Sequence, residues 1–257
     1  MQDLEIRTET NTEAQSGSST EEHISKIPNF TSIIIPIYNV NYPLFHYTGN
    51  CIGSIREHTE KGTYEIILID NGSPVKPSKL ADYKADKIIV NQENKGVAVA
   101  WNQGIRIATG EYIVILNNDT MVFDNWLPDL VGALQKADLI MATPMYGEPF
   151  SRAVEAAQKR SLWENKSIEE SFSEFRDFAC FAARKSLFET IGMFDEQFFA
   201  YSEDLDFLRR MDQEGLKYFS TRKVNIFHVI GATTTSIPET PDTMNKSKEK
   251  LKEKWGE

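Results

Sequence analysis

The sequence predicts an α/β fold with a mostly parallel, Rossmann-like sheet that is flanked by helices. Short apolar runs alternate with stretches of helical character between residues 31 and 143, and such alternation favours a parallel, helix-covered sheet. Polar side chains directly follow three of the runs, as they do where strands end at a ligand-binding crevice. The runs are 31–37, 64–70, 86–90, 111–116 and 137–143.

The N-terminal segment differs in composition from the rest of the chain. Residues 1–28 are rich in Glu, Thr, Ser, Gln and Asn and have almost no apolar periodicity. A segment of this kind cannot bury enough apolar surface to offset the entropy of ordering it. We therefore expect a polar, disordered tail that carries no chemistry.

The composition of the chain limits the classes of partner and the cellular compartment that we expect. The chain of 257 residues carries a formal net charge of −10, whereas a protein that binds a phosphate backbone is expected to show a basic face. We expect no nucleic-acid partner and, because no apolar run approaches the roughly 18 residues that span a bilayer, no transmembrane segment. Cys51 and Cys180 lie far apart without metal-type spacing. Reduced thiols in the cytoplasm are the simplest account, with peripheral attachment to a membrane left open.

The first two strands end in polar residues that belong at one edge of the sheet. Pro36, Tyr38 and Asn39 end the run 31–37, and Asp70 with Asn71 ends the run 64–70. Taken singly, each cluster is explained by turn formation. Taken together, they favour a crevice at the carboxyl ends of parallel strands.

The run 111–116 leads into the most informative cluster, Asn117, Asn118 and Asp119. Mg²⁺ and Mn²⁺ prefer oxygen ligands, often one carboxylate with water and phosphate completing the shell, so Asp119 is a candidate metal ligand. An Asx-turn that caps its own backbone is the alternative. The preceding segment 97–108 places apolar residues at helical spacing, which predicts a helix packed on the sheet.

After Pro144 the alternation ends. Residues 145–175 form a polar, aromatic-bearing stretch without strand character, which is typical of lids and binding loops. A strand is expected again over 217–229. The C-terminal segment from about residue 237 is rich in Lys and Glu and is expected as a charged tail or a solvated helix.

A second acidic focus begins at Ser202, which we interpret as the N-cap of a helix. Glu203, Asp204 and Asp206 then lie in its first turn. Either the helix dipole alone explains these acids, or one of them is a general base for a substrate hydroxyl. The apolar stripe of this helix is expected to consist of Leu205, Leu208 and Met211.

His228 lies near the end of the expected strand 217–229, after an apolar, alternating run, and precedes a Gly-Ala-Thr loop. A single histidine near a strand end is more often a hydrogen-bonded structural residue. The functional alternative is a metal ligand that completes the site begun by Asp119.

In order and spacing, five segments resemble a family-2 glycosyltransferase with the GT-A fold. They are SIIIPIYN, IILIDNGS, the segment from NQENKG to NNDT, IGMFDEQFFAYSEDLDF, and His228. The resemblance implies an enzyme that moves a sugar from a nucleotide diphosphate to an acceptor hydroxyl with inversion. It also implies one domain over 29–236, with a nucleotide-sugar half (29–143) and an acceptor half (144–236).

The resemblance also implies a role for each matching residue. The first two strand ends match the segments that hold the nucleotide base in the family. The segment at the start of the helix matches the one that lines the donor diphosphate and sugar. The Asp-x-Asp metal element maps to Asn117, Asn118 and Asp119, with Asn117 in place of the first Asp, and the acidic pair maps to Glu203 and Asp204, with Asp204 the expected base. The base-binding residues are Pro36, Tyr38, Asn39 and Asp70; the donor-lining residues are Lys95, Gly96 and Asn102.

The expected donor is a uridine diphosphate sugar, because the Asp70 carboxylate can accept a hydrogen bond from the ring N–H of uracil. The expected acceptor is a glycan, a lipid-linked sugar or a protein, and Mn²⁺ or Mg²⁺ is the expected cofactor. Two alternatives stay open: a nucleotidyltransferase, which should carry a Gly-rich basic loop after the first strand, and a non-catalytic module that binds sugar nucleotides or glycans.

Overall fold

The computed structural model describes most of the chain beyond the N-terminal tail. The described residues are 6–7, 29–75, 80–136, 140–147, 150–163, 166, 172–173, 178–229, 232 and 240–256. The expected disordered tail therefore lies outside the described residues, except that β1 (Ile6–Arg7) pairs antiparallel with the edge strand β4.

Four parallel strands form the N-terminal half of the sheet. In spatial order they are β4 (Lys87–Val90), β3 (Tyr64–Asp70), β2 (Thr31–Ile37) and β5 (Tyr112–Leu116). The four corresponding runs of the sequence are thus confirmed as strands. Because the strands are parallel, their carboxyl ends meet at one edge of the sheet.

The C-terminal half continues the same sheet with mixed directions. β9 (Cys180–Arg184) lies antiparallel between β5 and β7 (Met141–Gly147), and β10 (Tyr218–His228) is parallel to β7. β10 also pairs antiparallel with β6 (Thr120–Met121) and with β8 (Phe172–Ser173). The expected strand over 217–229 is confirmed, and the sheet is mostly parallel with β9 as the exception within its centre.

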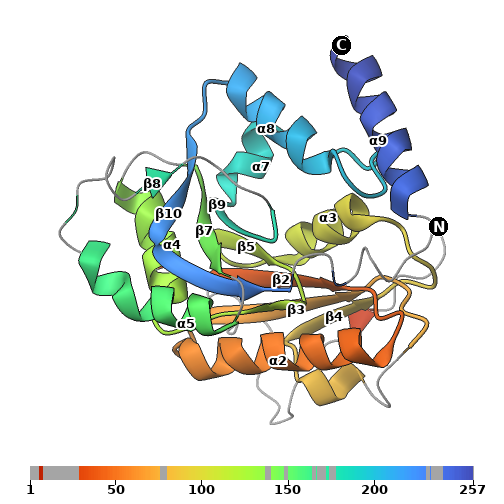
Figure 1. Ribbon diagram of the computed structural model, residues 1–257. Helices are drawn as coiled ribbons and strands as arrows, with labels where there is room; N and C mark the ends of the chain where they lie inside the picture. Colours follow the sequence, from red (N-terminus) through yellow and green to blue (C-terminus); the bar gives the residue numbers. More distant parts are fainter. Residues whose placement is uncertain are drawn as a thin grey trace, which may run out of the picture.

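Helices cover both faces of the sheet (Figure 1). Ile33, Ile35 and Ile37 of β2 face the layer of α2 (Tyr42–His58) and α4 (Trp126–Lys136). Ile34 faces the layer of α3 (Val97–Ile107), α7 (Ser186–Thr190) and α8 (Glu203–Gln213). The alternation along β2 follows from the two-residue period of a strand, so its near-continuous apolar sequence reflects burial on both faces.

Two expectations about the C-terminal half are wrong. The stretch 145–175 begins with the last residues of β7 and contains α5 (Phe150–Gln158) and a short 3₁₀ helix (Lys159–Trp163), so its described part is structured. The stripe on α8 differs from the expected one at Leu205, which is exposed. Met211 is buried and Leu208 packs against the core as expected, and Phe207 is buried with Glu203 and Asp206. The inward face of α8 carries carboxylates whose burial the apolar pattern alone does not reveal.

The C-terminal segment forms the expected helix, α9 (Thr240–Trp255), but one side of it is not solvated. Ser247 and Leu251 are buried. Lys254 Nζ lies 2.7 Å from Asp195 Oδ2 and 2.6 Å from Asp206 Oδ1, which anchors α9 to α8 and to the loop before it. A 3₁₀ helix (Leu80–Tyr83) completes the described elements. None of the described helices combines the length and the apolar character needed to cross a membrane.

Candidate active site

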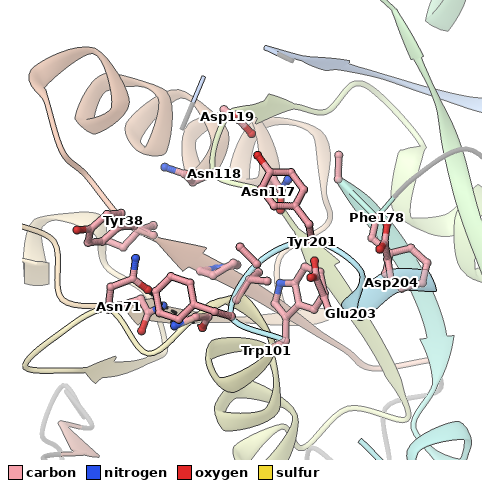
Figure 2. A pocket seen from close by; sticks show the side chains of 18 of the residues that line it. Tyr38, Asn71, Trp101, Asn117, Asn118, Asp119, Phe178, Tyr201, Glu203 and Asp204 are labelled. Atoms are coloured by element: carbon pink, nitrogen blue, oxygen red, sulfur yellow. Dashed lines mark hydrogen bonds between the residues drawn. The ribbon is translucent and has the colours of Figure 1, made fainter. Parts of the chain in front are cut away.

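A cavity of about 560 Å³ opens at the carboxyl ends of the parallel strands. Three groups of polar side chains line it, as Figure 2 shows: Tyr38 and Asn71 on one side, Asn117 to Asp119 above, and Glu203 with Asp204 on the other side. The crevice predicted from the polar strand ends is therefore present. The remaining walls come from the start of α3, from the residues just before β9, from the loop before α8, from the end of β10 and from α9. They include Gly96, Val97, Trp101, Phe178, Ala179, Phe199, Ala200, Tyr201, His228, Thr243 and Met244.

The side of the cavity near Tyr38 is built on a network of amides. Asn71 Nδ2 donates to Asn94 Oδ1 (2.9 Å) and to the Gly96 carbonyl (3.0 Å), and Asn71 Oδ1 accepts from Asn91 Nδ2 (2.9 Å) and the Lys95 N–H (3.1 Å). Asn71 thus fixes the loop that leads into α3. The sequence marks Asn71 as a strand-end residue, but its partners come from a segment that lies twenty to twenty-five positions later.

Two residues expected at the nucleotide base lie behind the cavity wall instead of lining it. Asp70 is 0% exposed, and its Oδ1 accepts a hydrogen bond of 2.9 Å from the Ser73 N–H. Asn39 is also fully buried, and its Oδ1 accepts from Thr48 Oγ1 at 3.3 Å. Pro36 and Tyr38, in contrast, line the cavity as expected.

Of the two residues expected to contact the donor just before α3, one lines the cavity and the other does not. Gly96 lines the cavity with φ of +89°, and a Cβ at this position would lie 2.5 Å from the Phe199 carbonyl oxygen. The position therefore requires glycine on two grounds, backbone conformation and close approach. The Lys95 side chain is exposed and does not belong to the cavity lining.

The side-chain amide of Asn102 is hydrogen-bonded to other residues of the protein. Its Nδ2 donates to the Phe194 carbonyl and to Glu196 Oε1, both at 2.9 Å, and its Oδ1 accepts from the Phe194 N–H at 3.0 Å. Asn102 is 1% exposed and does not line the cavity. In this structure Asn102 holds the loop before α8. It therefore does not occupy the donor-lining position that we expected.

Asp119 and His228 meet at the upper end of the cavity, where His228 Nε2 lies 3.4 Å from Asp119 Oδ1. The pairing of β6 with β10 sets His228 opposite Thr120, and the Val229 N–H donates to the Asp119 carbonyl at 2.9 Å. Both side chains are buried. The structure therefore brings together the carboxylate and the imidazole that the sequence offers as metal ligands.

The donor set at this position fits a divalent cation that shares its shell with a ligand. The carboxylate suits Mn²⁺ or Mg²⁺ when phosphate oxygens and water supply the remaining contacts, and the imidazole nitrogen favours Mn²⁺ of the two. Among the described residues, no three His, Cys, Asp or Glu side chains gather into a self-sufficient metal site. Asn118, which is buried nearby, donates through Nδ2 to Thr48 Oγ1 at 2.9 Å, so this amide supports the edge.

The acidic pair lies at the start of α8 behind a strained loop. Tyr201 and Ser202 both adopt left-handed backbone conformations, with φ of 66° and 69°. Non-glycine residues in this region cost about 1–3 kcal/mol each and persist only when the surroundings hold them. Here the Phe199 carbonyl accepts from the Val97 N–H (2.8 Å) and the Ala200 carbonyl from Ser247 Oγ (2.7 Å), so α3 and α9 hold the loop. Ser202 precedes the helix as expected, but its side chain makes no capping bond.

Burial separates the acids of α8 chemically. Glu203 is 7% exposed, and desolvation, aided by the neighbouring Asp204 charge, raises its pKa from 4.5 to about 8. Asp204 is more exposed, and its Oδ1 accepts from the Leu205 N–H at 2.8 Å. Asp206 faces away into contacts with Arg210 Nε (3.1 Å), Lys254 Nζ and the Trp255 indole N–H (3.0 Å), and it does not line the cavity.

Sequence reasoning missed much of the cavity wall. Trp101 appeared only as part of an apolar helix stripe, and Phe178, Thr243 and Met244 carried no signal. Phe199 and Tyr201 are the exceptions, because aromatic residues directly before an acidic helix start are a sequence signal for a partly dry wall. Residues of α9 reach the site only through tertiary contacts.

Comparison with known proteins decides the family. The model of glycosyl transferase family 2 matches residues 32–206, which is most of the chain and includes the three groups of polar side chains in the cavity but not His228. The chain belongs to glycosyl transferase family 2. Among curated relatives, the glycosyltransferase GlyG of Streptococcus pneumoniae is 36% identical over 115 residues, covering 42% of this chain and 36% of that protein. The uncharacterized glycosyltransferase YibD of Escherichia coli is 31% identical over 118 residues, covering 44% of this chain and 33% of that protein. This family-2 chain thus spans about a third of the length of these two relatives.

Solved structures show that the family-2 chain has the GT-A fold. GalNAc-T7, solved with UDP, GalNAc and Mn²⁺, superposes with a TM-score of 0.65 at 17% identity over 87% of this chain and 47% of that one. The mannosyltransferase PcManGT of Pyrobaculum calidifontis, solved with GDP-Man and Mn²⁺, gives 0.61 at 18% identity over 83% of this chain and 63% of that one. The α/β fold with a mostly parallel sheet and flanking helices is therefore confirmed.

Proposed function

We propose that this family-2 protein is an inverting glycosyltransferase that uses a nucleotide diphosphate sugar and a divalent cation. The observation that carries the proposal is the placement of the Asp119–His228 pair and the Glu203–Asp204 pair in the walls of one cavity. Transfer with inversion needs two things: stabilisation of charge on the departing diphosphate and a base that deprotonates the incoming hydroxyl. The two pairs match these two needs.

Asp119 and His228 are the residues that would hold the cation, with Asn117 and Asn118 beside them. A bound Mn²⁺ or Mg²⁺ supplies electrostatic stabilisation for the negative charge of the leaving diphosphate. Two solved relatives of the fold contain Mn²⁺, which supports this part of the proposal. The first ligand position of the Asp-x-Asp element is Asn117 here, so the protein's only carboxylate at this strand end is Asp119.

We assign the general base to Asp204 rather than to Glu203. A base must be ionised at the working pH, and the pKa of about 8 for Glu203 keeps its carboxyl largely protonated at neutral pH. Asp204 lines the same cavity and is the more exposed of the two. It therefore accepts the proton of the acceptor hydroxyl as the hydroxyl oxygen attacks the sugar, while Glu203 stays neutral beside it.

We assign the donor as a uridine diphosphate sugar, with the base near Pro36, Tyr38 and Asn71. Asp70, whose Oδ1 accepts from the Ser73 N–H, is the residue that we assign to the ring N–H of uracil. Since Asp70 lies behind the cavity wall, this contact requires the turn at Ser73 to move. The acceptor is a glycan, a lipid-linked sugar or a protein, and Lys95, which is exposed at the entry to α3, is available to the diphosphate.

The experiment is a panel of sugar nucleotides tested for transfer and for slow donor hydrolysis, with and without Mn²⁺. We expect release of nucleotide from a UDP-sugar and little from GDP-mannose or a CMP-sugar, together with a rise in apparent melting temperature on binding. Asp70→Asn should raise the KM for the donor more than it lowers kcat, as expected for lost ground-state binding. Binding without any release of nucleotide would identify a non-catalytic module, and preference for a guanosine donor would overturn the uridine assignment.

A further inference from the structure

Trp101 lines the cavity and has a buried indole N–H that bonds to none of the residues that the structure describes. The side chain is 3% exposed, lies in the second turn of α3 and lines the cavity. Its ring is held by aromatic neighbours, with centroid distances of 4.8 Å to Phe194 and 6.3 Å to Phe178. Among the described residues, none accepts a hydrogen bond from Trp101 Nε1. A buried indole N–H usually finds an acceptor, so this one calls for an explanation.

The other tryptophans with described indoles follow the usual rule. Trp126 Nε1 donates to Thr59 Oγ1 at 2.8 Å, and Trp255 Nε1 donates to Asp206 Oδ1 at 3.0 Å. Both bonds lie outside the cavity lining. The unsatisfied indole is therefore the one in the wall of the candidate active site.

Glu203 contributes a complementary group to the same cavity. Its Oε2 is buried and has no hydrogen-bond partner among the described residues. In Figure 2 the Glu203 carboxyl group and the Trp101 indole both lie on the side of the cavity away from Tyr38. A donor and an acceptor are thus unsatisfied in one cavity and do not bond to each other.

We infer that Trp101 Nε1 and Glu203 Oε2 form a subsite for one hydroxyl group of the transferred sugar. A hydroxyl accepts one hydrogen bond and donates another, so a single group on the ligand satisfies both atoms. The aromatic faces of Trp101 and Phe178 provide an apolar surface for the C–H face of a sugar ring. A subsite of this kind selects among sugars, because a sugar that lacks the hydroxyl leaves two buried groups unpaired.

The subsite fits the transferred sugar better than the nucleotide. Tyr38 and Asn71, which we assign to the base, lie on the opposite side of the cavity (Figure 2). Trp101 belongs to the helix whose first residues, Gly96 and Val97, contact the carbonyl of Phe199 in the loop before the acidic pair. The sugar must lie between the diphosphate and the base Asp204, which is the region that these elements enclose. This inference rests on the proposed function.

The test compares Trp101→Phe with wild type in calorimetric titrations, using UDP alone and the UDP-sugar that the panel identifies. The substitution removes the N–H and retains an aromatic ring. We expect the affinity for the UDP-sugar to fall about 3- to 10-fold, the change that corresponds to one hydrogen bond, and the affinity for UDP to stay unchanged. Monodeoxy versions of the same UDP-sugar locate the hydroxyl: for one of them, wild type and Trp101→Phe should bind equally.

Two further variants keep the test decisive. Trp126→Phe removes a buried, satisfied indole N–H outside the cavity, so it should lose stability without changing affinity for UDP-sugar relative to UDP. Glu203→Met keeps a side chain of similar length and removes both carboxyl oxygens, so it should weaken the UDP-sugar but not UDP, with the effect vanishing for the same monodeoxy donor. Glu203→Met also tests the subsite if Trp101→Phe fails to fold.

The outcomes separate the subsite from the proposed function. If wild type binds and transfers from a UDP-sugar but Trp101→Phe and Glu203→Met weaken UDP and UDP-sugar equally, the subsite is wrong and the function stands. If both variants change only the KM for acceptor, the hydroxyl belongs to the acceptor and the inference is overturned. If no sugar nucleotide binds to wild type, the proposed function itself fails.

Discussion

His228 Nε2 lies 3.4 Å from Asp119 Oδ1 because the last residue of β10 pairs with the first residue of β6. The two-residue strand β6 starts directly after Asp119, so the same ladder that closes the sheet carries the imidazole to the carboxylate. No flexible loop stands between either residue and the sheet. The pair is therefore held by backbone hydrogen bonds, which favours a site that is preformed before a ligand enters.

The first prediction concerns the cation. Asp119→Ala should abolish Mn²⁺-dependent turnover, because Asp119 is the only carboxylate at this strand end. His228→Ala should raise the Mn²⁺ concentration for half-maximal activity with only a small change in melting temperature. His58→Ala is the control, since His58 pairs with Asp124 at 2.6 Å outside the cavity lining and should leave the Mn²⁺ dependence unchanged. Full activity of wild type in excess chelator would remove the cation from the mechanism.

The second prediction concerns the base. Asp204→Asn should reduce turnover by about 10² to 10⁴-fold, the usual effect of losing a general base, while donor affinity stays nearly constant. If Asp204 only stabilised the helix dipole, the same change would cost about 0.3–1 kcal/mol of stability and leave turnover intact. Both quantities are measured on one variant. A stable, active Asp204→Asn protein would move the base to Glu203, since Asp206 is occupied by Arg210, Lys254 and Trp255.

The third prediction follows from the raised pKa of Glu203. In the unfolded chain this carboxyl loses its proton near pH 4.5, and in the folded protein it keeps the proton up to a pKa of about 8. The folded state therefore binds more protons across this window, and its contribution to stability is lost as the pH rises from 4.5 to 8, by at most about 1.4 kcal/mol per pH unit.

Glu203→Gln should remove this part of the pH dependence. Urea unfolding at several pH values, compared between wild type and the variant, isolates the contribution of one group. Glu155→Gln is the control because Glu155 is exposed on α5, where its salt bridge to Lys159 lowers its pKa. Parallel stability curves for wild type and Glu203→Gln between pH 5 and pH 8 would show that Glu203 is ionised in the folded protein.

The fourth prediction tests whether Asn102 holds the loop at Phe194 or contacts the donor. Because its amide holds Phe194 and Glu196, Asn102→Ala should lower the free energy of unfolding by about 1–3 kcal/mol, the cost of unsatisfied buried partners. It should also reduce turnover, since the loop that it releases leads to Asp204. Unchanged stability with a higher KM for the donor would restore the direct role that the sequence predicted.

The local sequence pattern alone predicts most strands of the sheet and the polar residues at their ends. A buried strand needs a short apolar run, and a chain that leaves a sheet needs residues that turn, so the runs 31–37 and 64–70 and the polar residues after them are visible in the sequence. The same logic identified Asp119 and His228 by residue type and by position at strand ends. It did not identify β9, whose antiparallel insertion between β5 and β7 depends on pairing with strands distant in sequence.

Tertiary structure decided which polar groups reach the cavity. Asp70 and Asn102 match the family pattern, yet the former lies behind the wall and the latter binds the loop at Phe194. Asp206 and Glu203 occupy the same helix turn, but Lys254 of α9 pairs with Asp206, whereas no described residue bonds to Glu203 Oε2 and burial raises the pKa of Glu203. The periodicity of apolar residues indicates which side of a helix is buried. It does not indicate which residues of other elements pack against that side. The role of a buried polar group is set by partners that only the folded chain supplies.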